Sequence, residues 1–236
     1  MSSKILRRSG VAVVEYLTMA GHVPSRVFMA GVGGHCQEVD VMREMWPDIE
    51  LYGWEPHPKT FANLLETFPG RIENKALSDK PGEIRMNSKT NWKDGASVHR
   101  PPPGKDKDWY FFEVMATTLN EAGLNMTQRK DGLLWMDCEG SELSVLMGGD
   151  RFINDNVVAI NCEMTGRPRM DTWPKSIELH QWLTRFGFYQ AWVHTIRPSI
   201  CQFDAIYLHR DVFDPSLTCC MDSAMGWTSS KVLSCP

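Results

Sequence analysis

Short apolar runs alternate with segments of helical periodicity along most of this chain. The runs typical of buried strands cover residues 25–30, 50–54, 133–136 and 156–163. Between them, apolar residues recur at helical spacing, most clearly over 59–68 and 176–186. Strands that alternate with helices in this way predict an α/β fold, with a mostly parallel sheet and helices on both faces.

Weaker signals complete the pattern. A first helix is predicted over 2–20, because Gly21 and Pro24 follow it and end it. The other predicted elements are a third strand over 71–77, an extra edge strand over 83–86, a strand over 109–114 and a short helix over 118–124. Two last strands, 188–194 and 203–208, close the sheet, and the second of them suits an edge or antiparallel position.

These elements divide the chain into three parts. We expect a helix within 1–24 that packs on the domain, one domain over 25–213, and a C-terminal tail over 214–236 without a clear period. Residues 87–108 interrupt the domain with three consecutive prolines and several basic residues. A loop of this length without periodicity is usually functional or disordered, and we interpret it as a mobile lid.

Composition narrows the class of protein. The chain has 236 residues, of which 42% are hydrophobic and 23% charged, as in ordinary globular proteins. A net charge of −4 gives no general attraction to nucleic acid or to an anionic membrane. Seven cysteines without Cys-x-x-Cys spacing predict a reduced, cytoplasmic protein without structural zinc. No segment approaches the roughly 20 apolar residues that span a membrane.

A glycine loop follows the first strand and precedes a helix. Gly31, Gly33 and Gly34 form this loop, and glycines there let the chain turn tightly while a ligand approaches the backbone. The second strand ends in Glu55, 24 residues after Gly31. An acid at that spacing can accept hydrogen bonds from two ribose hydroxyls. The combination outweighs the alternative in which Glu55 only caps the next helix.

Acidic residues also follow the apolar run that ends at Met136. Asp137 and Glu139 come directly after this predicted strand, and Gly140 then leads into a helix. Ligands of open α/β sheets bind outside the carboxyl ends of the strands, which makes acids there candidates for function. The structural alternative is an acidic helix start, which applies best to Glu142.

Several of these motifs together resemble the FkbM family of S-adenosylmethionine-dependent methyltransferases. The similarity covers roughly residues 26 to 209, and the stretch around Asp137 is the most specific part of it. The motifs that carry it are Val27-Phe28-Met29-Ala30-Gly31-Val32-Gly33, Glu55-Pro56-His57-Pro58, Ala76-Leu77-Ser78-Asp79 and Met136-Asp137-Cys138-Glu139-Gly140-Ser141-Glu142, with Leu146 and Gly148.

The resemblance implies a Rossmann-like class I methyltransferase fold, with seven strands of which the seventh is antiparallel. It implies that S-adenosylmethionine lies over Gly31 and Gly33 and that Glu55 binds its ribose. Further cofactor contacts implied in this way are Ala76 and Leu77 on the adenine side, Ser97, and Asp137. Two departures from the family pattern lie near the methionine part: Met29 or Ala30 replaces an acid, and His35 replaces a common glycine.

The chemistry expected from this site is methyl transfer to a hydroxyl. An acceptor oxygen must lie about 3 Å from the methyl group and must lose its proton. We expect Asp137 to orient the acceptor or act as base, with Glu163 or His194 in support. In a rival mechanism Asp137, Glu139 and Glu163 bind Mg²⁺, which lowers the pKa of the hydroxyl, but we do not expect a metal.

The acceptor is expected to be a sugar or another small molecule, because the family mostly methylates such oxygens. An RNA- or cap-type methyltransferase on the same fold is an alternative, and it would need a focused basic groove. A non-catalytic module that only binds cofactor or ligand is a third interpretation. An Asp-x-Glu-Gly pattern after the fourth strand has no role in hydride transfer, which disfavours a dehydrogenase. The sequence gives no indication of an oligomeric state.

Overall fold

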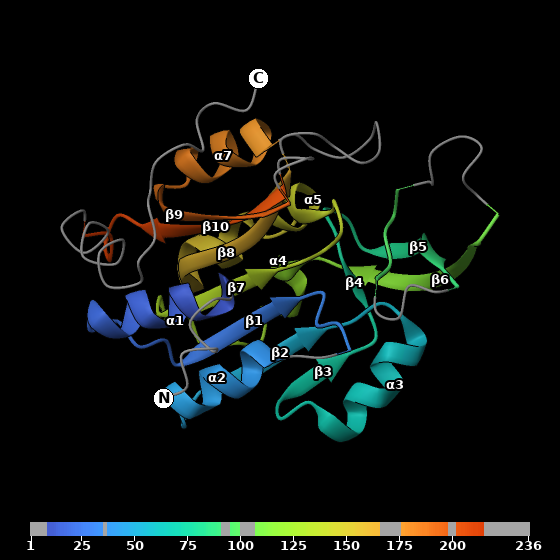
Figure 1. Cartoon of the computed structure of the whole chain (residues 1–236), viewed down its shortest axis with the longest axis horizontal. Coiled ribbons are helices and arrows are strands. Elements are labelled where there is room, and N and C mark those ends of the chain that lie inside the picture. The colour runs from blue at the N-terminus through green and yellow to red at the C-terminus, as the bar shows by residue number, and fades with distance from the viewer. Residues whose placement is uncertain are drawn as a thin grey trace.

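The computed structural model describes residues 9–34, 37–90, 95–99, 107–165, 176–197 and 202–214. Within these residues seven strands form the main sheet, in the order β3-β2-β1-β7-β8-β10-β9 (Figure 1). The strands are β1 (Arg26–Ala30), β2 (Glu50–Trp54), β3 (Arg71–Glu73), β7 (Gly132–Met136), β8 (Val157–Thr165), β9 (Phe188–Arg197) and β10 (Gln202–His209).

Five neighbouring strands of this sheet run parallel to one another, in the order β3, β2, β1, β7 and β8. β10, the last strand of the chain, is antiparallel to both of its neighbours, β8 and β9. Parallel strands place their carboxyl ends at one edge, so the residues that follow β1, β2 and β7 lie together. This confirms the predicted class I methyltransferase fold, including its antiparallel seventh strand.

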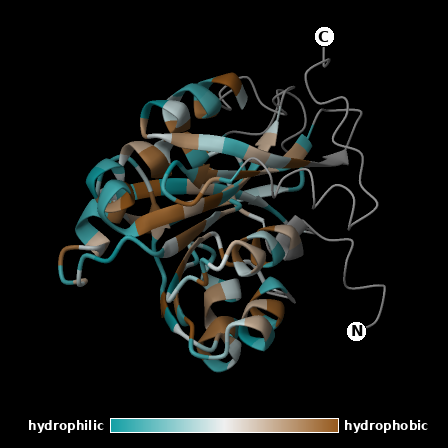
Figure 2. Cartoon of the chain, turned by 90° about the vertical axis from the view of Figure 1, so that its left-hand side faces the viewer, coloured by the Kyte–Doolittle hydropathy of each residue, from teal (hydrophilic) through white to brown (hydrophobic). Residues whose placement is uncertain are grey.

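Helices cover both faces of the sheet, as predicted. One apolar cluster joins the sheet to α1 (Ser9–Met19), α2 (Gln37–Met45) and α3 (Pro58–Thr67). A second cluster joins the opposite face to α4 (Leu119–Ala122), α5 (Glu142–Met147), α6 (Asp150–Asn156) and α7 (Ser176–Arg185). Strands in the middle of the molecule are therefore mostly hydrophobic, while hydrophilic residues gather on the outer helices and loops (Figure 2). In the described parts of the chain, no helix is long and apolar enough to cross a membrane.

A second, smaller sheet departs from the prediction. It has the order β4-β6-β5, with β4 (Ala76–Leu77), β5 (Gly82–Lys89) and β6 (Trp109–Thr117). The single strand predicted over 71–77 is wrong, because β3 pairs with β2 whereas β4 pairs with β6. Asn74 lies at the break, where its side-chain amide donates to the carbonyls of Glu55 (2.8 Å) and Pro56 (3.1 Å). Helix α6 also has no counterpart among the predicted elements.

The predicted lid is only partly described. Residues 87–89 continue β5, and Asn87 forms an antiparallel bridge with Ser97. Residues 91–94 and 100–106 lie outside the described residues, as do 1–8 and the tail from 215 onward. The mobility of the lid and the division into three parts therefore remain predictions.

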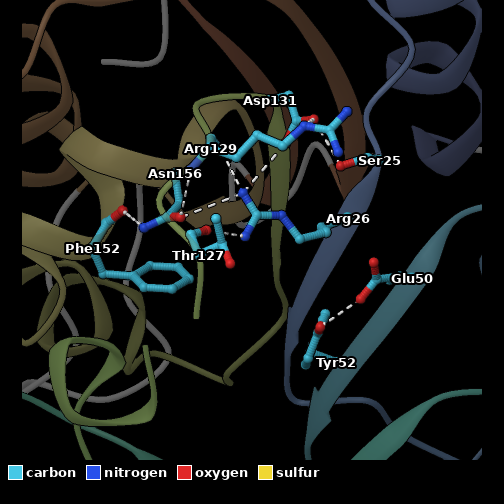
Figure 3. Close-up of polar contacts among 9 residues, drawn as sticks. All are labelled: Ser25, Arg26, Glu50, Tyr52, Thr127, Arg129, Asp131, Phe152 and Asn156. Carbon is cyan, nitrogen blue, oxygen red and sulfur yellow. Dashed lines mark hydrogen bonds and ion pairs between the residues drawn. The ribbon is translucent and has the colours of Figure 1, made fainter. Parts of the chain in front are cut away.

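A buried arginine at the amino end of β1 makes several polar contacts, which Figure 3 shows. Arg26 begins β1 and is only 5% exposed. Its guanidinium donates to the carbonyls of Thr127, at 2.9 Å, and Arg129, and lies 3.4 Å from both Asp131 Oδ1 and Asn156 Oδ1. These contacts hold the start of β1 against the loop that precedes β7, which fixes the two strands whose other ends build the site.

This network predicts a difference between two arginines that both contact Asp131. Arg26→Met should lower the free energy of unfolding by about 3 kcal/mol, because it leaves buried acceptors without their donor. Arg129→Met should cost less than about 1 kcal/mol, since the Arg129 side chain is 65% exposed although it lies 2.6 Å from the same carboxylate. Urea unfolding measures both, and equal losses would contradict the assignment.

Candidate functional site

The backbone leaving β1 and the backbone leaving β7 meet at Gly31. The Asp137 N–H donates to the Ala30 carbonyl at 3.1 Å, and Gly31 adopts a φ of +74°. A Cβ on Gly31 would lie 2.1 Å from the Asp137 carbonyl oxygen, so a side chain there would clash with backbone. Glycine is therefore required at position 31 both for its conformation and for this close approach.

The Glu55 carboxylate is fixed by backbone donors at the end of β2. Its Oε2 accepts from the Gly33 N–H at 2.9 Å, and its Oε1 accepts from the His57 N–H at 2.8 Å. The side chain is only 3% exposed. These two bonds hold the carboxylate at the end of β2, beside the glycine loop.

A cavity of about 400 Å³ lies at this edge of the sheet. Its wall includes the glycine loop 30–33, residues 54–56 after β2, Ala76 and Leu77, and part of the loop after β7. Glu55 and Asp137 are thus brought to one cavity, together with the predicted cofactor residues Gly31, Gly33, Ala76 and Leu77. Its volume falls within the range of small-molecule and cofactor sites.

The loop after β7 turns tightly around the Glu142 carboxylate. Glu142 Oε1 accepts from the N–H groups of Cys138 (2.9 Å) and Gly140 (3.3 Å), and the side chain is 4% exposed. Burial raises the pKa of this carboxyl to about 7. Glu142 therefore stabilises the loop, in line with the structural alternative weighed for it, and Asp137 and Glu139 face the cavity.

The Cys138 thiol lies among the carboxylates of this edge. Its pKa is raised well above the ordinary value, first by burial and then by the charges of Glu142, Asp137 and Glu55. The thiol is therefore neutral at physiological pH, and its Sγ donates to the Ala30 carbonyl at 3.2 Å. This second bond to Ala30 adds to the junction between β1 and β7.

Ser97 approaches the site through the loop after β7. Its Oγ donates to the Glu139 carbonyl at 2.7 Å, and the side chain is fully buried. His99 Nε2 lies 3.0 Å from the Gly140 carbonyl. Among the described residues that line the cavity, Gly95, Ala96 and Val98 come from this segment and Ser97 does not.

Glu163 and His194 lie farther along the same edge. Met136 pairs with Cys162, so the residues that follow them, Asp137 and Glu163, are neighbours on adjacent strands. Glu163 accepts a hydrogen bond from Gln202 and is not among the described residues that line the cavity. His194 occupies a register position opposite Asp204, which in turn pairs with Glu163; its side chain, like His35, lies outside the described residues.

Two further residues line the cavity that sequence reasoning did not identify. Trp54 Nε1 and Ser141 Oγ are buried polar atoms without a hydrogen-bond partner among the described residues. Buried polar atoms are usually paired, and a ligand is one partner that could pair them. The sequence could have indicated them only through their positions, because Trp54 directly precedes Glu55 and Ser141 directly follows Gly140. In the part of the chain that the structure describes, no group of three His, Cys, Asp or Glu side chains is arranged to hold a metal.

Comparison with protein families decides the assignment. The model of the methyltransferase FkbM domain matches residues 29–189, which is more than half of the chain. The chain belongs to the FkbM methyltransferase-domain family. The match includes the glycine loop, Glu55 and the loop after β7. A comparison with curated protein sequences yields no match.

A solved structure of an FkbM methyltransferase shows the fold of this FkbM-family chain. The methyltransferase FkbM from Methylobacillus flagellatus KT aligns with a TM-score of 0.51 and 10% identity, over 79% of this chain and 44% of that one. The chain thus spans less than half of that structure. A putative methyltransferase from Thermobifida fusca YX has a TM-score of 0.49 and 12% identity, over 88% and 81%. Fibrillarin from Aeropyrum pernix, in complex with S-adenosyl-L-methionine, aligns with a TM-score of 0.46 and 11% identity, over 83% of this chain and 74% of that one.

Glu142 makes the stability of the domain depend on pH. Because its pKa is about 7 in the fold against 4.5 ordinarily, its ionisation opposes folding. Its favourable contribution is complete below pH 4.5 and is lost as the pH rises through 7. Glu142→Gln keeps an acceptor but cannot ionise, so its free energy of unfolding should rise relative to the wild type by about 3 kcal/mol between pH 4.5 and 8.

Urea unfolding over this pH range measures the difference. Glu66→Gln serves as the control, because Glu66 is exposed on α3, and its curve should stay parallel to that of the wild type. A Glu142→Gln curve that also stays parallel would contradict the assigned role.

Proposed function

We propose that this FkbM-family chain is an S-adenosylmethionine-dependent O-methyltransferase that acts on a hydroxyl of a sugar or another small molecule. One observation carries the proposal: a backbone-fixed carboxylate, Glu55, and a second acid, Asp137, line the same cavity beside the glycine loop. The first suits a ribose and the second suits the place where the methyl group is transferred.

The residues of the cavity fit the proposed cofactor. Glu55 would accept hydrogen bonds from the ribose hydroxyls, because it lines the cavity and each carboxylate oxygen can accept more than one hydrogen bond. Ala76 and Leu77, both buried, would contact the adenine, and the backbone of Gly31 and Gly33 would lie against the methionine side. Trp54 Nε1 and Ser141 Oγ would gain partners among the polar atoms of the bound molecule. When bound, S-adenosylmethionine supplies an activated methyl group.

Asp137 would act on the acceptor. Its carboxylate, at the end of β7, would accept a hydrogen bond from the acceptor hydroxyl and take its proton as the oxygen becomes methylated. Glu163 lies on β8, next to β7, and His194 lies on β9, which β10 separates from β8; both would support the acceptor from that side. Gly95, Ala96 and Val98, which line the cavity, would help to exclude water from the reacting groups. Magnesium is not required in this mechanism.

We also propose a reducing, cytoplasmic location. Cys138 and Cys162, both described, are free thiols, and Cys162 is completely buried within the second apolar cluster. Free buried thiols are typical of reducing compartments, which supports the location proposed from the cysteine spacing.

Removal of the Glu55 carboxylate, which is proposed to bind the ribose, should weaken cofactor binding. Glu55→Ala should reduce the affinity for S-adenosylhomocysteine by roughly 1.5–3 kcal/mol, because a charged hydrogen-bond acceptor is lost. The control is Glu50→Ala, at the other end of β2, where the carboxylate accepts a hydrogen bond from the Tyr52 hydroxyl at 2.6 Å. Titration calorimetry measures both, and unchanged affinity in Glu55→Ala would remove Glu55 from the site.

Asp137→Asn tests the chemical step. The wild type is incubated with S-adenosylmethionine and a panel of sugars, small hydroxylated molecules and a short RNA, and the release of S-adenosylhomocysteine is followed. We expect a small-molecule acceptor to be methylated and Asp137→Asn to reduce kcat by about 10²–10⁴-fold, the share of an acid–base group. Asp150→Asn, on the exposed start of α6, should keep full turnover. Full turnover in Asp137→Asn would exclude it as base, and methylation of the RNA alone would favour the cap-type alternative.

A further inference from the structure

The turn after β7 contains a residue in an unfavourable conformation. Glu139 has a φ of +50° and Gly140 a φ of +98°, and the Ser141 N–H closes the turn on the Cys138 carbonyl at 3.3 Å. Glycine adopts positive φ freely, but a glutamate does so at a cost that surrounding contacts must offset. Because Glu139 lines the cavity, the contacts that hold this turn also shape the site.

Side chains hold the turn from two directions. On one side Glu142 accepts from the N–H groups of Cys138 and Gly140. On the other, Ser97 Oγ donates to the Glu139 carbonyl at 2.7 Å, and His99 Nε2 donates to the Gly140 carbonyl at 3.0 Å. A carbonyl only accepts, so the His99 ring carries its proton on Nε2 in this contact.

Ser97 is itself held in place by backbone and side-chain bonds. Its N–H and carbonyl exchange hydrogen bonds of 2.9 and 2.7 Å with Asn87 of β5. Its hydroxyl gives its hydrogen to Glu139 and accepts from the His99 N–H at 3.2 Å. The hydroxyl is thus engaged both as donor and as acceptor, and the side chain is fully buried, whereas Ala96 and Val98 on either side of it in the chain line the cavity.

We propose that Ser97 and His99 are positioning residues, which hold the Glu139–Gly140 turn in its left-handed conformation against the cavity and affect cofactor binding only through that turn. The resemblance to the family instead implied a direct contact between Ser97 and the cofactor. This inference rests on the proposed function, because it takes S-adenosylmethionine as the ligand of the cavity. It makes the segment 95–99 a structural part of the site.

A double-mutant cycle between Ser97 and Glu139 tests the proposal. The affinity for S-adenosylhomocysteine is measured by calorimetry for the wild type, Ser97→Ala, Glu139→Gly and the double variant. Ser97→Ala should weaken binding about tenfold in the wild-type background, because the strained turn loses its support. It should weaken binding less than about twofold in the Glu139→Gly background, since glycine keeps positive φ without help.

Ser88→Ala is the matched control. Ser88 is equally buried, and its Oγ donates to the Gly95 carbonyl at 2.7 Å, so it holds the same segment without touching the turn. Its effect on affinity should be the same factor in both backgrounds. This comparison separates a contact with the turn from general loosening of the segment.

Two results would overturn the proposal: an equal effect of Ser97→Ala in both backgrounds, or no effect of it in the wild type. If the wild type does not bind S-adenosylhomocysteine, the proposed function fails instead. The same cycle is then measured as the midpoint of thermal unfolding without ligand. Non-additive shifts for Ser97 and Glu139 would still support the positioning role, and additive shifts would refute it.

Discussion

The site depends on the close approach of two backbone segments, those leaving β1 and β7. With no Cβ at Gly31, the Asp137 carbonyl occupies the space that a side chain would fill. The Asp137 N–H and the Cys138 thiol both donate to the Ala30 carbonyl, so the two segments are joined by hydrogen bonds as well as by contact. This contact places the acid of one strand beside the glycine loop of another, and the cavity forms around it.

Once the strands meet in this way, several carboxyl groups lie near one another, and each needs a compensating contact. Glu55 and Glu142 are stabilised in the same way, because each carboxylate accepts hydrogen bonds from two backbone N–H groups. The pKa values of Glu142 and Cys138 are nevertheless raised, because burial and neighbouring negative charges still disfavour their ionised forms. Glu142 stabilises the loop, which leaves Asp137 and Glu139 to face the cavity.

The fold was predictable because periodicity and glycine placement are local signals. The order of strands and helices, the glycine loop and Glu55 could all be read in this way. The second sheet could not, because the break at Asn74 depends on carbonyls of residues 55 and 56, which are distant in sequence. The contacts of Ser97 and His99 could not be predicted either. They go to backbone carbonyl groups of a distant turn, and every residue has such a carbonyl whatever its side chain.

We propose above that the cavity beside Gly31 and Asp137 holds the cofactor, with its ribose on Glu55. A crystal structure of the complex with S-adenosylhomocysteine tests this claim most directly. We expect both ribose hydroxyls within hydrogen-bond distance of the Glu55 carboxylate, and the sulfur toward Asp137. A ligand bound at another edge of the sheet, or in this cavity with its ribose away from Glu55, would contradict the account.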